Sequence, residues 1–380
     1  MVAIRSRMVL VALMAIFLFL GPLNVTSSTF VGTEPLPDQF SDEAFWKMMT
    51  EFSETGGYFR SDNFVSNETT FQFVLKDLKK TKAGGVYLGV GPDQNFTYIV
   101  AMQPKLAIIF DIRRQNAMQH LMFKALIEMS TDRADFLSRL FSRRRPESVG
   151  AKSTSEQLFE AFNALEPERE LYLENFQAIK RQLEENHKFK LTRDDEESIQ
   201  YIYGSFYAGG PDLNYNGVNG NLGRTIMPTY QEIMESTDEE GINRSYMGTE
   251  ENFKILQDYE KKNLIVPVVG DFAGAKAIRA VGAYLKEHDA FVGAFYLSNV
   301  EQYLFQQNDD WSKFYNNVDT LPVDSTSRFI RSVFNGQGGT FQQSSFGLRS
   351  ASLLGSIPDH LKAFKAGDVK SYYDVIGMSK

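Results

Sequence analysis

Apolar residues occur in two patterns along the chain, continuous runs and three-and-four spacing, and the alternation of these patterns predicts an α/β protein. Nearly continuous apolar runs occur at 86–90, 106–112, 264–270 and 290–297. Such runs are typical of strands that are buried on both faces of a parallel sheet. Between them, apolar residues recur at three-and-four spacing, which predicts helices. The pattern therefore favours a doubly wound, mostly parallel α/β sheet of the Rossmann-like type.

The remaining helices and strands are assigned from the same two patterns. Ser66 stands at the N-cap position of a predicted helix at 66–79, because its hydroxyl can accept a hydrogen bond from the first turn. The other predicted helices of the α/β part are 42–54, 92–102, 115–129, 274–288, 300–307 and 360–366, and the other strand candidates are 329–333 and a terminal strand at 372–378.

A long segment at about 130–260 carries no strand pattern. Its amphipathic stretches predict helices at 133–142, 155–165, 170–186 and 194–206. A Gly- and Asn-rich stretch at 209–224 indicates a long loop, and loops of that length are often functional. We therefore expect one α/β domain at 43–380 that contains a helical insertion or cap at 130–260.

The first 27 residues have the features of an export signal. Two arginines precede the apolar run 8–20, which a Gly-Pro pair ends. The run is shorter than the roughly 20 residues that a membrane span needs. We expect an exported protein, with either a cleaved signal peptide or an uncleaved anchor that is its only contact with the membrane. The Ser/Thr/Pro-rich residues 28–42 then form a linker.

The location of the protein depends on whether this segment works as a signal. An exported chain would be periplasmic or anchored to the inner membrane and facing outward, whereas without a working signal it would be cytoplasmic.

Composition excludes several kinds of site. The 380 residues include no Cys, which excludes disulfides, thiolate metal sites and Cys nucleophiles. The four His residues are scattered without metal-ligand spacing, so we expect no metal site. A net charge of −8 argues against nucleic acid as a partner. A small-molecule ligand is the partner that remains.

Two glycines mark the best candidate binding turn. Gly89 and Gly91 fall where the strand at 86–90 passes into a helix. Without a Cβ the backbone can approach a ligand closely, and free N–H groups at the start of a helix can contact its polar groups. Asn95 lies in the region where the dinucleotide fingerprint has its third Gly, which counts against an NAD-using enzyme.

Acidic and polar residues follow the other three strands. Asp111 ends the second strand, where a carboxylate can accept hydrogen bonds from both hydroxyls of a ribose; the alternative is an acid that caps the next helix. Asp271 follows the third strand and Asn299 the fourth. The carboxyl ends of parallel strands form one edge of the sheet, where ligands of open α/β folds bind.

This order of elements resembles class I S-adenosylmethionine-dependent methyltransferases. The resemblance rests on a Gly-x-Gly turn, Asp after the second strand, Asp-Phe after the third and Ser-Asn after the fourth. It implies a methyltransferase-type sheet and S-adenosylmethionine as cofactor. The residues to which it gives cofactor contacts, together with their neighbours in the same turns, are Gly89, Gly91, Asn95, Asp111, Ile112, Asp271 and Phe272.

The segment at 58–68, before the first strand, has more polar side chains than a connecting loop needs. In the superfamily that the chain resembles, an element at this place often covers the cofactor. Tyr58, Arg60, Asn67 and Glu68 are therefore expected to contact a substrate together with Asn299; the alternative is that they form helix caps and salt bridges.

The whole chain also resembles an uncharacterised bacterial branch of this superfamily with a signal-like N-terminus, on the runs 57–63, 111–116 and 298–303. We expect an exported methyltransferase-like protein that acts on a small molecule. The alternative is an exported binding protein that keeps the fold without activity.

Overall fold

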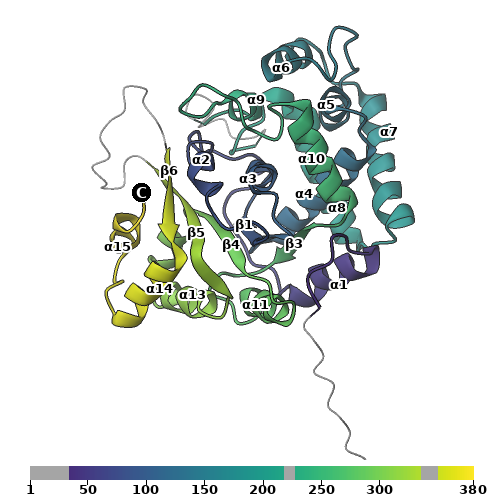
Figure 1. Cartoon of the computed structure of the whole chain (residues 1–380). Coiled ribbons are helices and arrows are strands. Elements are labelled where there is room, and N and C mark those ends of the chain that lie inside the picture. Colours follow the sequence, from purple (N-terminus) through teal and green to yellow (C-terminus); the bar gives the residue numbers. More distant parts are fainter. Residues whose placement is uncertain (1–33, 218–226, 335–349) are drawn as a thin grey trace, which may run out of the picture. The chain divides into compact units, whose positions relative to one another are not determined.

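A six-stranded sheet forms the centre of the computed structural model, in the order β3-β2-β1-β4-β5-β6 (Figure 1). The first five strands along the chain are parallel to their neighbours, and β6 pairs antiparallel with β5. The strands are β1 (Val86–Val90), β2 (Ala107–Asp111), β3 (Ile265–Val269), β4 (Val292–Ser298), β5 (Val323–Phe334) and β6 (Ser350–Ser356). The predicted α/β fold with a mostly parallel sheet is thereby confirmed.

The structure describes residues 34–217, 227–334 and 350–380. The predicted signal segment at 1–27 lies outside the described residues, as does the part of the predicted loop after residue 217. Residues Glu34–Lys380 belong to one unit. Leu36 and Phe40, in the second half of the predicted linker, are buried against its core. In the described part of the chain, no helix combines the length and apolar character needed to span a membrane.

Helices cover both faces of the sheet because successive side chains of a strand point to opposite sides. On β4, Phe295 contacts Phe314 of α13, with ring centroids 6.2 Å apart. The next residue, Tyr296, contacts Tyr98 of α3 at 5.0 Å. Burial of both neighbours explains why β4 is an unbroken apolar run rather than an alternating one.

The helices of the α/β part have the following bounds: α1 (Asp42–Phe52), α2 (Leu75–Leu78), α3 (Gln94–Met102), α11 (Ala277–Glu287), α12 (Val300–Leu304), α13 (Asp310–Val318), α14 (Ile357–Ala366) and α15 (Tyr372–Gly377). Those between β2 and β3 are α4 (Arg114–Met129), α5 (Arg133–Phe141), α6 (Ser155–Asn163), α7 (Arg169–Lys180), the π-helix η1 (Arg181–Asn186), α8 (Arg193–Gly209), the 3₁₀ helix η2 (Gly210–Asp212), α9 (Tyr230–Glu235) and α10 (Glu250–Lys261). The segment between β2 and β3 thus adds no strand to the sheet over its described residues.

The helix predicted at 66–79 is wrong for most of its length, because only α2 at Leu75–Leu78 is α-helical. Tertiary hydrogen bonds hold the preceding residues in an irregular conformation. The Thr70 hydroxyl donates to the carbonyl of Ser350 (3.0 Å) and accepts from the N–H of Ser352 (2.9 Å), which fixes this segment along β6. Ser66 caps no helix.

The terminal strand predicted at 372–378 is also wrong, since these residues form α15. Ser371 and Asp374 form a capping box that starts the helix. The strand at the edge of the sheet is instead β6, whose sequence SASLLGS has too little apolar alternation to be recognised as a strand.

The turn between β1 and α3 is fixed from inside by one amide. Asn95 donates to the carbonyls of Val90 (2.9 Å), Gly91 (3.3 Å) and Pro92 (2.7 Å), and its amide oxygen accepts from the Tyr87 hydroxyl (2.8 Å). The amide therefore satisfies backbone groups that the end of the strand would otherwise leave unpaired.

We predict that Gly89→Ala destabilises the fold by about 1–3 kcal/mol, because the added methyl overpacks this turn. A Cβ at Gly89 would lie 1.9 Å from the amide oxygen of Asn95. Gly377→Ala is the matched control, since no atom lies within 4 Å of a Cβ built there. Urea unfolding measures both variants, and equal stability of the two would contradict the turn's tight packing.

Candidate functional site

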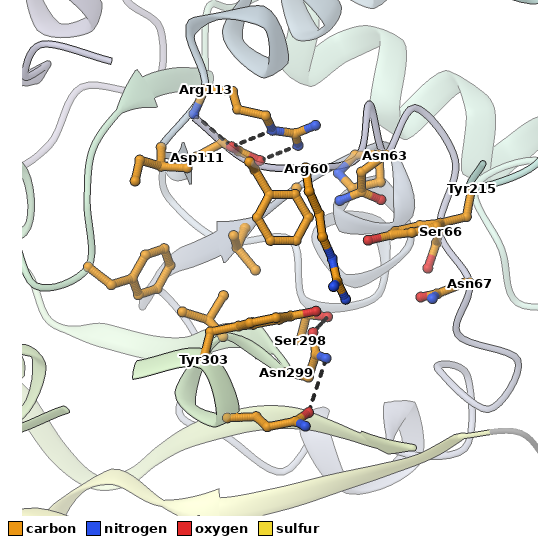
Figure 2. Close-up of a pocket in the computed structure, with 18 of the residues that line it drawn as sticks. Arg60, Asn63, Ser66, Asn67, Asp111, Arg113, Tyr215, Ser298, Asn299 and Tyr303 are labelled. Atoms are coloured by element: carbon orange, nitrogen blue, oxygen red, sulfur yellow. Dashed lines mark hydrogen bonds and ion pairs between the residues drawn. The ribbon is translucent and has the colours of Figure 1, made fainter. Parts of the chain in front are cut away.

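A cavity of about 800 Å³ opens at the carboxyl edge of the sheet (Figure 2). Its volume lies in the range of small-molecule sites, roughly 300–1,000 Å³. The strand order reverses beside β1, and this switch point is where open α/β sheets bind ligands. Residues that follow or end five strands line the cavity, namely Gly91 and Pro92, Asp111–Arg113, Asp271 and Phe272, Ser298 and Asn299, and Phe334.

Gly91 brings the backbone of the β1–α3 turn to the cavity wall. Its φ of +78° lies in the left-handed region that favours glycine. Its carbonyl oxygen lies 2.8 Å from the Nε2 of His120. Burial lowers the pKa of His120 to about 4, so the ring is neutral and Nε2 donates to this carbonyl. The hydrogen bond that His120 donates to this turn is therefore a neutral one.

Asp111 lines the cavity as predicted, but its carboxylate already has a partner. The Arg113 side chain donates from Nε to Oδ1 (2.9 Å) and from Nη2 to Oδ2 (2.7 Å), and the Arg113 N–H donates to Oδ1 (2.8 Å) (Figure 2). Burial lowers the pKa of Arg113, but Asp111 raises it more, so that the pKa lies above its ordinary value. Only Oδ2 keeps room for one more hydrogen bond.

Arg113 also connects this pair to the segment before the first strand. Its Nη1 donates to the carbonyls of Ser61 (2.9 Å) and Asp62. The carbonyl of Ile112, which lines the cavity as predicted, accepts from the N–H of Gly57 (2.7 Å). These bonds hold the segment against the end of β2.

Asp271 and Phe272 both line the cavity, as the sequence predicts for the end of β3. The Asp271 carboxylate accepts from the N–H of Ala273 (2.9 Å). The Phe272 ring stacks on Phe295 with centroids 5.6 Å apart, and it is almost fully buried. The pair thus contributes an apolar ring and a carboxylate to the cavity wall.

Glu68 is a buried carboxylate at the cavity wall, with only 1% of its surface exposed. Its Oε1 accepts from the hydroxyls of Tyr296 (2.8 Å) and Ser298 (2.5 Å), and its Oε2 accepts from the Gln94 amide (2.7 Å). Burial raises the pKa of Tyr296 well above its ordinary value, and the nearby Glu68 raises it further. Tyr296 therefore stays a neutral donor.

Ser298 takes a strained backbone conformation at the end of β4, with φ +50°. Non-glycine residues in this region often occur at functional sites, where the surrounding structure holds them. Its hydroxyl bond to Glu68 supplies that support. The neighbouring Asn299, a predicted substrate contact, lines the cavity and donates to the Gln302 side chain (3.4 Å).

The other residues predicted before the first strand all reach the cavity. Tyr58 is 85% exposed and stands at its mouth. The Arg60 side chain is exposed and points into the cavity (Figure 2). The Asn67 amide lies 4.0 Å from the sulfur of Met227, its one hydrogen-bond partner in the described part of the chain. Together with Glu68, these side chains cover the carboxyl ends of β1 and β4.

Two predicted ligand contacts lie outside the cavity. Gly89 and Asn95 are not among its lining residues, because the Asn95 amide faces Gly89 and the turn carbonyls. Sequence reasoning also overlooked Gln94 and Tyr296, which hold Glu68. The two-residue spacing between Tyr296 and Ser298 on a strand was the available signal, because such residues share a face.

A buried ion pair fixes α12, which carries the cavity residues Tyr303 and Leu304. The guanidinium of Arg331 in β5 donates to both carboxylate oxygens of Glu301, and its Nη2 lies 3.0 Å from Oε1. Neither side chain is more than 2% exposed. Tyr315 donates a third hydrogen bond to Glu301, at 2.5 Å.

The chain matches one known family over most of its length. The match to the family model described as Domain of unknown function (DUF7790) spans residues 63–348, which is 286 of the 380 residues. The chain belongs to the DUF7790 family. No match was found among curated proteins. The DUF7790 match includes β1 to β5 and most of the cavity, whereas Tyr58 and Arg60 precede it.

We predict that Arg331→Met lowers the free energy of unfolding by about 3–5 kcal/mol, because it leaves the Glu301 charge buried and unpaired. The double variant Glu301→Gln/Arg331→Met should regain part of this loss. Lys262→Met, at an exposed ion pair, is the control and should change stability far less. A double variant as unstable as the single one would show that the loss does not come from the uncompensated charge.

We predict a pH dependence of stability from Asp93, at the start of α3. Burial raises its pKa to about 7, although it accepts a hydrogen bond from Tyr246 (2.7 Å). Between about pH 4 and 7 the unfolded chain releases this proton and the folded chain keeps it, so stability falls as pH rises, by at most about 1.4 kcal/mol per unit. Asp93→Asn should make this slope shallower and leave the part that comes from Glu260, whose pKa burial raises to about 8. Unfolding curves from pH 4.5 to 8 with the same slope in both proteins would contradict the assignment.

Proposed function

We propose that this protein binds S-adenosylmethionine in the carboxyl-edge cavity and transfers its methyl group to a small-molecule acceptor. One observation carries the proposal: groups that follow β1, β2, β3 and β4 all line a single cavity at the switch point of the sheet. The sequence resemblance to class I methyltransferases assigns cofactor or substrate contacts to these same four strand ends.

The residues present fit the parts of such a cofactor. Gly91 would lie beside its methionine part, since the turn has no side chain there. Asp111 has one acceptor position left on Oδ2, which suits one ribose hydroxyl. The ring of Phe272 offers an apolar surface for the adenine, and Asp271 offers an acceptor for its amino group.

When bound, the cofactor supplies an electrophilic methyl group on a sulfonium. The chain's task is then to position the acceptor for in-line transfer, which requires little acid–base chemistry. Asn299 and Ser298 line the cavity at the end of β4 and would contact the acceptor. Glu68 fixes the Ser298 hydroxyl, so that the hydroxyl oxygen can accept a hydrogen bond from an acceptor O–H or N–H.

A second candidate function is ligand binding without methyl transfer. The Asp111–Arg113 pair favours it, because Arg113 takes three of the four acceptor positions that a ribose diol could use, two with its guanidinium and one with its backbone N–H. Export through the predicted signal at 1–27 would also favour it, since S-adenosylmethionine is made in the cytoplasm.

Calorimetric titration with S-adenosylmethionine and S-adenosylhomocysteine tests the proposal. Protein freed of bound ligand should bind both, and Asp111→Asn should weaken binding by about 10–100-fold, because a hydrogen bond to a charged acceptor is lost. Asp309→Ala, an exposed acid far along the sequence, is the control. Unfolding curves must show that Asp111→Asn is folded.

Absence of heat and of any thermal shift with both compounds would reject methyl transfer from this cofactor. Binding of both compounds to Asp111→Asn with unchanged affinity would place the ribose elsewhere. Binding of S-adenosylmethionine without methyl transfer to any acceptor would favour the second candidate function, ligand binding without activity.

A further inference from the structure

The acids of the cavity are already hydrogen-bonded within the protein. The carboxylate of Glu68 accepts three hydrogen bonds, that of Asp111 is paired with a guanidinium, and that of Asp271 accepts a backbone N–H. A carboxylate has about four acceptor positions. The cavity therefore keeps little acceptor capacity for a ligand that brings many donors.

Arg60 is a cavity cation without an acidic partner. In the part of the chain that the structure describes, its side chain makes no hydrogen bond or ion pair, and it points toward Ser298 and Asn299 (Figure 2). Residues 1–33, 218–226 and 335–349 contain no Asp or Glu. No acid from these segments can therefore neutralise Arg60, whose guanidinium stays charged in water.

Two amides near Arg60 also have donor capacity left. Among the described residues, the Asn67 amide has only the sulfur of Met227 as a hydrogen-bond partner, and a thioether is a weak acceptor. The Asn63 side chain lines the same wall and makes no hydrogen bond within the described ranges. Asn63 has φ +48°, a second strained residue at this cavity. Donors thus gather where the ligand must supply acceptors.

Aromatic rings form the adjoining walls. Phe59 meets Tyr303 edge to face, with centroids 5.6 Å apart. Tyr215 also lines the cavity, on the same side as Ser66 and Asn67 (Figure 2). Flat rings suit a planar apolar body of similar thickness.

We propose that the methyl acceptor is a small carboxylic acid with a planar apolar body, and that Arg60 binds its carboxylate. A guanidinium and a carboxylate match as two parallel hydrogen bonds, which fixes orientation as well as affinity. This assignment rests on the proposed function, which places the cofactor at the end of β1. The acid then binds at the β4 end of the cavity. S-adenosylmethionine also carries a carboxylate, so the test must separate the two sources.

The test uses the full-length protein with benzoate and cinnamate as probes, and benzamide and cinnamamide as their neutral counterparts. Ligand-observed NMR titrations give the affinities. We expect both acids to bind at least about tenfold more tightly than the amides, and Arg60→Met to reduce acid binding to the level of the amides. Arg60→Lys should retain only part of the difference.

Arg144→Met is the matched control, because it removes the same charge from an exposed side chain that does not line the cavity. It should leave acid binding unchanged. Arg60 has no partner to lose within the described residues, so its variants should unfold as the wild type does.

The second arm of the test measures the binding of S-adenosylhomocysteine and of 5′-methylthioadenosine, which lacks the carboxylate. Weaker binding of S-adenosylhomocysteine to Arg60→Met, with acid binding unchanged, would assign Arg60 to the cofactor and overturn the proposal. Equal binding of the acids to wild type and Arg60→Met, or no binding of either acid to wild type, would also overturn it. The acid arm is read without the cofactor, so it stands or fails independently of methyl transfer.

Discussion

The carboxylate of Glu68 connects three segments that are far apart in the sequence. Its donors come from α3 and from two positions of β4, and Glu68 itself belongs to the segment that precedes β1. A buried charge without hydrogen bonds is costly, so these segments are stable only when the donors are in place. The wall of the cavity and the strained end of β4 both depend on this arrangement.

The need of buried polar groups for hydrogen-bond partners also explains why the cavity lies at this edge of the sheet. Parallel strands end together, and their last backbone groups need partners from the loops that follow. Here the Asn95 amide satisfies the carbonyl of Val90, the last residue of β1, and Arg113 joins the end of β2 to the residues before β1. Among the described residues, hydrogen-bond donors around Arg60 remain without partners. A ligand bound there would have to supply acceptors.

Strands β1 to β4 could be predicted from the sequence because they are buried on both faces and have continuous apolar runs, whereas the partly exposed β6 could not. The placement of Asp111, Asp271 and Asn299 at one edge followed from strand direction alone. Sequence could not show that Asn95 turns inward, since an amide that satisfies its own turn looks like one that faces a ligand. The 66–79 segment was misassigned because its partners in β6 are more than 250 residues away.

If the cofactor binds as proposed, one ligand reaches the ends of β1, β2 and β3 at the same time. A crystal structure of the full-length protein with S-adenosylhomocysteine measures this directly. We expect a ribose hydroxyl at Oδ2 of Asp111, the adenine against Phe272, and the Arg60 side chain free of the cofactor. Clear density for the ligand elsewhere, or an empty cavity at saturating ligand, would contradict it.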